Sequence, residues 1–296
     1  MTGSLSLAPD ERRVGFLVGA AVGAALAART AGAIDAPAVR AALADGVVPL
    51  APPAGRRRAA VALADGLLEE LLGGGVDLQR LSHRWVAWWR EDGLDADAGL
   101  VEALAHLASF DAPLGEQGRS TAAALAATLP AALAVGSPRT MVAGTFHTAR
   151  LLDPTPEGGL MAVAVVLAAG NFLQGRRDFI ADVLGMLRAN EAPEALFGRV
   201  QAIARDPRRA PPPPRAGQAD AIEVGCWALW HAHHRPRAIE VLEAMATTGG
   251  ISPDAGAVLG GLLGARDGIA TWPAAWIEGT GEDAVLRQAA ALRAGG

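Results

Sequence analysis

The sequence contains no lysine and no tyrosine, and its single cysteine is Cys226. Without lysine, a Schiff-base amine and a phosphate-loop lysine are excluded, and without tyrosine a tyrosine general acid is excluded. One cysteine cannot form an intramolecular disulfide or a CxxC redox or zinc arrangement. Cys226 lies in the apolar run "EVGCWALW", where we expect the thiol to act as a small hydrophobic side chain. Every permanent positive side-chain charge is therefore an arginine.

Charge is also scarce in this chain. Charged residues make up 19% of the sequence, hydrophobic residues make up 51%, and the formal net charge is -5. These values indicate a well-buried globular protein that has no global attraction for nucleic acid or for an anionic membrane surface. A length of 296 residues allows one or two domains. We therefore expect neither nucleic acid nor a membrane as a partner.

An apolar run near the N-terminus, residues 14–28, follows paired arginines in the way that a secretory signal does. The run is too short to span a bilayer comfortably. Within it, Gly15, Gly19 and Gly23 recur every four residues, which places small side chains on one face of a helix. Another helix can approach such a face closely. We therefore interpret this segment as a buried core helix and predict a cytoplasmic protein.

Apolar residues at three- and four-residue spacing predict helices in most of the remaining chain. The predicted helices cover residues 59–72, 77–92, 100–110, 121–134, 159–175 and 178–189. No convincing series of alternating, β-branched segments bounded by turns is present. The sequence therefore predicts an all-α protein.

The one clear interruption is "ARDPRRAPPPPRAGQAD", residues 204–220. Four consecutive prolines favour polyproline II and cannot continue a helix. A proline-rich segment of this kind can serve as an SH3-type ligand, but arginines among prolines also suit a plain solvated loop. We expect a Pro/Arg-rich surface loop rather than a domain boundary.

The stretch "TTGGISPDAGAVLGGLLGARDG", residues 247–268, begins as a glycine turn and continues as a helix rich in glycine and alanine. It resembles the C-terminal signature of the ADP-ribosylglycohydrolase family, in which Gly-Gly precedes Asp-x-Asp-Thr and a small-residue helix. The segment "DGIATWPAAWIEG" and the first helix, "RVGFLVGAAVGAALAA", also resemble that family. The resemblance implies one domain over residues 1–296, a compact orthogonal helical bundle, and a cleft for ADP-ribose and two magnesium ions.

The family binds magnesium through carboxylates of two acidic turns, the ligand type that hard divalent cations require. The positions that match these turns in this chain are Gly55, Arg56 and Arg57 in the first, and Ile251, Ser252, Pro253 and Asp254 in the second. The aspartate of the family's first helix falls on Ala24. With four carboxylates missing from the two turns, we expect no dinuclear magnesium site, no other metal or cofactor, and no magnesium-dependent hydrolysis.

Arginine at the first turn permits two interpretations. In the simpler one, Arg56, Arg57 and Arg58 form a solvated turn, although cations at a helix N-terminus cost about 0.3–1 kcal/mol each. In the other, Arg56 or Arg57 projects into the former metal space and binds Asp254, an ADP-ribose-like or other anionic ligand, or an acidic side chain of a protein partner. Ser252 and Asp254 complete this candidate ligand-binding set.

Three functions remain open at this point. The first is a catalytically silent family member that binds an anionic ligand or a protein partner in a remodelled cleft. The second is a metal-independent hydrolase of an ADP-ribosyl or other N-glycosidic substrate, with Asp254 as its catalytic acid or base; a raised pKa of Asp254 would favour it. The third is a structural scaffold, which a filled and dry cleft would favour. The fold could also bring to the site an acidic residue from elsewhere in the chain, such as Asp35, Asp65 or Glu223.

The segment "WALWHAHHRPRA" places Trp227, Trp230, His231 and His234 on one helical stripe. A transition-metal site there would need a third convergent ligand, for which Glu223 lies one turn earlier. We interpret the stripe as aromatic packing that ends in solvated histidines.

Overall fold

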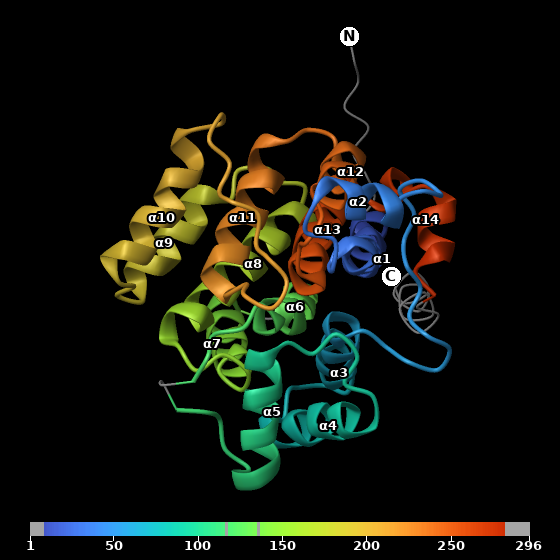
Figure 1. Cartoon of the computed structure of the whole chain (residues 1–296). Coiled ribbons are helices and arrows are strands. Elements are labelled where there is room, and N and C mark those ends of the chain that lie inside the picture. The colour runs from blue at the N-terminus through green and yellow to red at the C-terminus, as the bar shows by residue number, and fades with distance from the viewer. Residues whose placement is uncertain (1–8, 116–117, 135–136, 282–296) are drawn as a thin grey trace.

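The computed structural model describes residues 9–115, 118–134 and 137–281 (Figure 1). Within these ranges it contains no β-strand, only an isolated bridge between Arg215 and Ile251. The all-α prediction is therefore confirmed. The helices are α1 (Pro9–Thr30), α2 (Ala36–Ala42), α3 (Ala59–Leu72), α4 (Leu78–Glu91), α5 (Ala98–Phe110), α6 (Ala123–Thr128), α7 (Pro138–Ala149), α8 (Pro156–Leu173), α9 (Ile180–Ala189), α10 (Glu194–Arg205), α11 (Ala221–His234), α12 (Ala238–Thr248), α13 (Pro253–Asp267) and α14 (Ala274–Gly279), with short 3₁₀ segments η1 (Leu129–Leu133) and η2 (Ile269–Thr271).

Many helices begin where a short polar side chain accepts a hydrogen bond from the first turn. Such a side chain satisfies a backbone N–H that has no partner within the helix. The residues that do this are Asp35, Asp77, Asp97, Ser137, Thr155 and Asp220. The local sequence therefore sets where these helices start.

One predicted helix is divided in the structure. The periodicity predicts a single helix over residues 121–134, whereas the chain forms α6 and then the 3₁₀ segment η1. Pro130 lies at the start of η1 and has no N–H to donate to the preceding turn. The apolar spacing continues through the proline, but the α-helical hydrogen bonds do not.

Helices α1 and α13 lie side by side with their backbones in contact (Figure 1). The contact is made by two rows of glycines that run antiparallel: Gly15, Gly19 and Gly23 of α1 meet Gly264, Gly260 and Gly256 of α13. A Cβ atom on any of these glycines would overlap the carbonyl oxygen of the facing glycine. We call this contact the glycine seam. It confirms that the first helix is a core helix that another helix approaches closely.

The turn that precedes α13 depends on two glycines. Gly249 and Gly250 have φ angles of 68° and 64°, a backbone conformation that side chains disfavour. The N–H of Gly250 donates to the carbonyl of Thr30 at the end of α1, at 2.7 Å. A Cβ on Gly249 would also press on the Ala33 backbone. The turn therefore ties the start of α13 to the end of α1.

The Pro/Arg-rich loop is not a plain solvated connector along its whole length. Residues 206–210 are exposed, as predicted, but Pro214 is buried. The N–H of Ser252 donates to the Pro214 carbonyl at 3.3 Å, and the N–H of Ala216 donates to Gly250 at 2.9 Å. The end of the loop thus pairs with the turn before α13, a contact between segments that are distant in the sequence.

Arginine side chains satisfy carbonyl groups at helix C-termini, which have no partner within their own helix. Arg266, which is buried, donates through Nη1 to the carbonyls of Ala232 and Arg235 at 2.8 and 2.6 Å. Arg12 donates to the carbonyls of Phe172 and Arg266 at 3.0 and 2.8 Å. The guanidinium group has five N–H donors, so one side chain can serve two helix ends.

Two helices are long and apolar enough to cross a membrane, by length and composition alone: Asp10–Thr30 of α1 and Pro156–Leu173 of α8. Their most apolar windows are 78% and 72% buried inside the fold, respectively. Core helices of a soluble protein have the same properties. The predicted cytoplasmic location stays a prediction.

Candidate functional site

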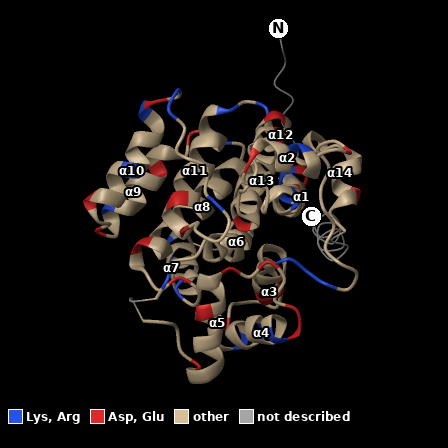
Figure 2. Ribbon diagram, in the orientation of Figure 1, with Lys and Arg blue, Asp and Glu red and all other residues tan. Residues whose placement is uncertain are grey.

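The first turn singled out by the sequence lies at the start of α3, where the incoming chain carries three arginines (Figure 2). Arg58, the residue before α3, is 4% exposed. Its Nη1 lies 2.5 Å from Oδ2 of Asp95, and its Nη2 donates to the carbonyl of Leu50 at 2.5 Å. A buried guanidinium group is therefore fixed between the turn after α4 and the segment before α3.

Arg56 and Arg57 also pair with aspartates. Nε of Arg56 lies 2.5 Å from Oδ1 of Asp92, and the backbone N–H of Arg57 donates to Oδ2 of the same aspartate at 2.6 Å. The guanidinium group of Arg57 forms an ion pair with Asp65 of α3, whose side chain is 6% exposed. Three consecutive arginines thus each bind a different aspartate. We call this set the arginine cluster: Arg56–Asp92, Arg57–Asp65 and Arg58–Asp95.

The second turn places Ser252 and Asp254 inside the protein at the start of α13. Ser252 is 4% exposed and its side chain does not cap the helix. Asp254 is 2% exposed, and its Oδ1 has no hydrogen-bond partner. Burial, followed by the charges of Asp97 and Asp95, raises the pKa of Asp254 well above its ordinary value of 3.8. The carboxyl group therefore holds its proton far more tightly than a solvated aspartate does.

Asp97 and Asp153 are connected through residues 120 and 121. The hydroxyl of Thr121 donates to Asp97 at 3.1 Å, while its backbone N–H donates to Oδ2 of Asp153 at 3.1 Å. The Ser120 hydroxyl donates to the same Oδ2 at 2.5 Å, and Thr155 donates to Oδ1 through its N–H and its hydroxyl. Asp153 is fully buried, and these four donors satisfy its charge. This network links the starts of α5 and α8 through Ser120 and Thr121.

The residues that surround Asp254 differ from those suggested by the sequence. Arg56 and Arg57 bind Asp92 and Asp65, and the charged groups that act on Asp254 are Asp97 and Asp95. Three of these aspartates come from the turn "EDGLDADAG", residues 91–99, which was not among the site segments predicted from the sequence. Its cluster of acids and glycines between two predicted helices was the available signal.

Of the three acids that the sequence left open, only one joins the arginine cluster. Asp65 binds Arg57, as described above. Asp35 caps α2, where it accepts the N–H of Ala38 at 2.8 Å. Glu223 is exposed in the first turn of α11. The fold therefore brings neither Asp35 nor Glu223 to the site as a new carboxylate.

Close to this site there is a small apolar cavity between α1, α3, η1 and α13. Its volume is about 20 Å³, which is room for about one water molecule. The lining includes Phe16, Ala20, Val61 and Ala257, and Asp65 is its only charged residue. In this conformation the cavity does not have space for a nucleotide-sized ligand.

The histidine segment is an aromatic packing stripe at its buried end. The rings of Trp227 and Trp230 each lie 5.0 Å from the ring of His231. Burial lowers the pKa of His231 to about 4, so its imidazole is neutral at physiological pH. Burial also raises the pKa of the nearby Cys226 thiol to about 11, so it is not a reactive thiolate. In the part of the chain that the structure describes, no group of three or more His, Cys, Asp or Glu residues is placed to hold a metal ion.

Comparison with known proteins identifies the scaffold. A sequence model of a family described as ADP-ribosylglycohydrolase matches residues 6–295. No curated protein matches the chain. A solved structure described as "ADP-ribosylglycohydrolase-related protein complex" is 24% identical, with a TM-score of 0.74, over 96% of this chain and 97% of that chain. The structural similarity shows the same fold, and the family match spans nearly the whole sequence, so this chain belongs to the ADP-ribosylglycohydrolase family.

Proposed function

We propose that this chain is a non-hydrolytic member of the ADP-ribosylglycohydrolase family that acts by binding a partner. The arginine cluster carries the proposal. Where the family pattern has an acidic turn, this chain has arginines, and each guanidinium group is bound by an internal aspartate. Positive charge from the chain itself thus stands where metal-binding carboxylates are expected.

The remaining acids do not fit two magnesium ions. Magnesium needs oxygen ligands in near-octahedral geometry, and carboxylates supply the negative charge that retains it. Asp92 and Asp95 are paired with arginines, and Asp97 accepts hydrogen bonds from Thr121 and from the first turn of α5. Burial raises the pKa of Asp254, which disfavours the charged carboxylate that a metal ion requires. No catalytic step through magnesium follows from this set of side chains.

A protein partner suits the site better than an enclosed small molecule. The side chain of Arg56 remains 43% exposed, so its guanidinium group can donate to an acidic side chain or a phosphate of a partner. Ser252 and Asp254 lie beneath the surface and the adjoining cavity is small. The solved structure that resembles this chain is described as a protein complex. As part of the proposal, we extend to this chain the property of assembling with another protein.

The raised pKa of Asp254 favours a second function, a metal-independent hydrolase. A general acid works best when its pKa lies near the working pH, and burial moves this carboxyl group in that direction. Asp254 is only 2% exposed, however, so a substrate would reach it only if the site opened. A purely structural role is the third candidate, and the small size of the cavity supports it.

The proposal is tested with ADP-ribose and an ADP-ribosylated peptide, each in magnesium-containing and EDTA-treated buffer. A ligand that binds only the native state raises thermal stability. We expect no magnesium-dependent thermal shift and no hydrolysis of the peptide. Magnesium-dependent binding would overturn the proposal, and magnesium-independent hydrolysis that is lost in Asp254→Asn would establish the second function instead. A metal-independent shift that Arg56→Ala removes would show that the arginine cluster binds an anionic ligand.

A further inference from the structure

A second surface, remote in sequence from the α13 turn, has the form of a docking groove. It has a volume of about 660 Å³ and lies between one face of α4 and the last turn of α5. His83, Val86, Ala87 and Arg90 line it from α4, at the spacing of a single helical face. The α5 side contributes residues 107–111. We call this surface the α4–α5 groove.

Apolar side chains are exposed on the elements that form the groove. Phe110, at the end of α5, is 69% exposed and lines the groove together with Val86 and Leu107. Of the large hydrophobic side chains that are exposed in the described part of the chain, Phe110 is the one that lines this groove. Exposed aromatic residues beside an apolar floor are typical of protein-binding surfaces.

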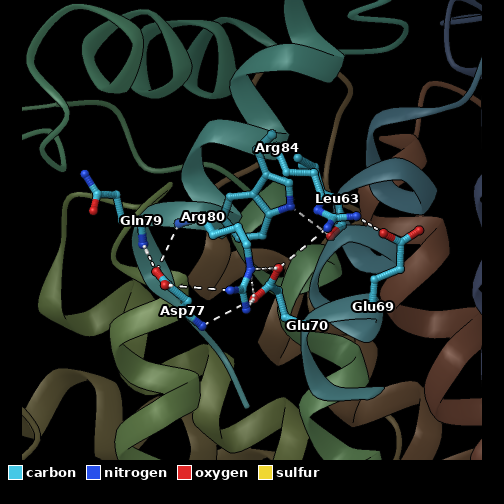
Figure 3. A network of polar contacts seen from close by, with 8 residues as sticks. Leu63, Glu69, Glu70, Asp77, Gln79, Arg80 and Arg84 are labelled. Carbon is cyan, nitrogen blue, oxygen red and sulfur yellow. Dashed lines mark hydrogen bonds and ion pairs between the residues drawn. The ribbon is translucent and has the colours of Figure 1, made fainter. Parts of the chain in front are cut away.

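The groove is held in place by polar contacts with α3 (Figure 3). Glu70 of α3 is 2% exposed and accepts hydrogen bonds from Nε of Arg80 at 2.8 and 2.9 Å. Arg80 lowers the pKa of Glu70, so the carboxylate stays charged. Arg84 forms an ion pair with the neighbouring Glu69. These contacts fix α4 on α3.

At the α5 side, Asp111 closes the groove. It accepts a hydrogen bond from Nε2 of Gln79 at 2.7 Å, and its other oxygen lies 3.0 Å from Nε2 of His83. Both wall helices are therefore positioned before any partner arrives. Such preorganisation lowers the entropy cost of binding.

Two charged residues, Arg90 and Asp111, line the groove, and they differ in their partners. Asp111 is already bound by Gln79 and lies beside His83, whereas Arg90 is exposed and makes no ion pair or hydrogen bond with another described residue. A partner with a carboxylate beside its apolar side chains would complement Arg90 and the apolar floor together. The described part of the chain offers no sheet edge for strand addition, whereas two helices with a groove between them suit a helix.

We propose that the α4–α5 groove binds an amphipathic helix of a partner protein, with apolar side chains on the floor and an Asp or Glu paired with Arg90. This inference rests on the proposed function, because it adds to the arginine cluster a second surface through which a non-hydrolytic family member recognises a protein partner.

A fluorescent helical peptide tests the proposal, with leucine at positions i, i+3, i+4 and i+7 and glutamate beside the leucines. Anisotropy should show saturable binding to the wild-type chain, and binding should weaken about tenfold in Arg90→Glu and in Phe110→Ser. Arg90→Glu should recover affinity for the same peptide with lysine in place of glutamate. Hydrogen exchange should show protection of residues 83–90 and 107–111.

Matched controls are Arg40→Glu and Ile34→Ser, which change an exposed arginine and a hydrophobic side chain that is 84% exposed, both outside the groove. Both controls should bind like the wild type, and circular dichroism should confirm that all variants are folded. No saturable binding, or equal loss in the groove and control variants, overturns the groove proposal. The proposed function fails separately, through magnesium-dependent binding of ADP-ribose.

Discussion

The glycine seam and the arginine cluster lie in two segments that align with the same family, yet they are built in opposite ways. The seam contains no polar side chain, and the backbones of α1 and α13 touch. The cluster consists of ion pairs, two of which are partly exposed. Close approach of two backbones holds the first region together, whereas paired opposite charges hold the second.

The difference follows from how each contact tolerates change. A backbone-to-backbone contact has no room for an added atom, because packed interiors relax only slightly. An ion pair at the surface contributes little to stability, so its members can be replaced with small effect. A scaffold can therefore keep its core while the residues at its functional site change.

The largest effect is expected from Gly260→Ala in the seam. Its Cβ would overlap the Gly19 carbonyl, so the helices must separate, at a cost of about 2–3 kcal/mol in the free energy of unfolding. Gly198→Ala in α10 is the matched control, because nothing lies within 4 Å of an added Cβ there. That control should gain about 1 kcal/mol from helix propensity. Urea denaturation measures the free energy of unfolding of both variants. If both variants changed in the same direction, the close backbone contact in the glycine seam would be wrong.

A smaller effect on the free energy of unfolding is expected from Arg58→Met. Because Asp95 and the Leu50 carbonyl lose the donor that this buried guanidinium group supplies, we expect the free energy of unfolding to fall by about 2 kcal/mol. Arg56→Ala is the control within the cluster, since Arg56 is 43% exposed and its ion pair is screened by solvent. We expect a loss of about 0.5 kcal/mol there. Equal losses in the two variants would show that burial does not distinguish the pairs.

The third change, Asp254→Asn, is expected to alter how the free energy of unfolding depends on pH. The folded state holds the proton of Asp254 above the ordinary pKa of 3.8, so the unfolded state releases it first as pH rises. The contribution of this group to the free energy of unfolding is therefore fully present at low pH. It decreases as pH rises from the ordinary pKa towards the raised pKa, by up to about 1.4 kcal/mol per pH unit.

Asparagine does not titrate, so Asp254→Asn should become more stable relative to the wild type as pH rises. Urea titrations from acidic to neutral pH measure the difference. Asp45→Asn is the control, because the side chain of Asp45 is 90% exposed. If the stability curves of Asp254→Asn and the wild type ran parallel, the raised pKa would be wrong.

Much of the fold follows from local patterns. The predicted helix over residues 59–72 coincides with α3, and the predicted segments 77–92 and 178–189 match α4 and α9 to within two residues. Polar caps mark several of the helix starts. Short helices such as α2 and α14 were not predicted, because six or seven residues give too little periodicity to detect.

The sequence by itself determined the helical class, the glycine rows that permit close packing, and the family to which the scaffold belongs. Only the tertiary structure decided that Arg56 and Arg58 bind Asp92 and Asp95, which lie 36 and 37 residues away. It also decided that Asp254 is buried beside two other acids. Periodicity reports which face of a helix is apolar, whereas the partner of a charged side chain depends on how distant turns meet, and no local pattern encodes that meeting.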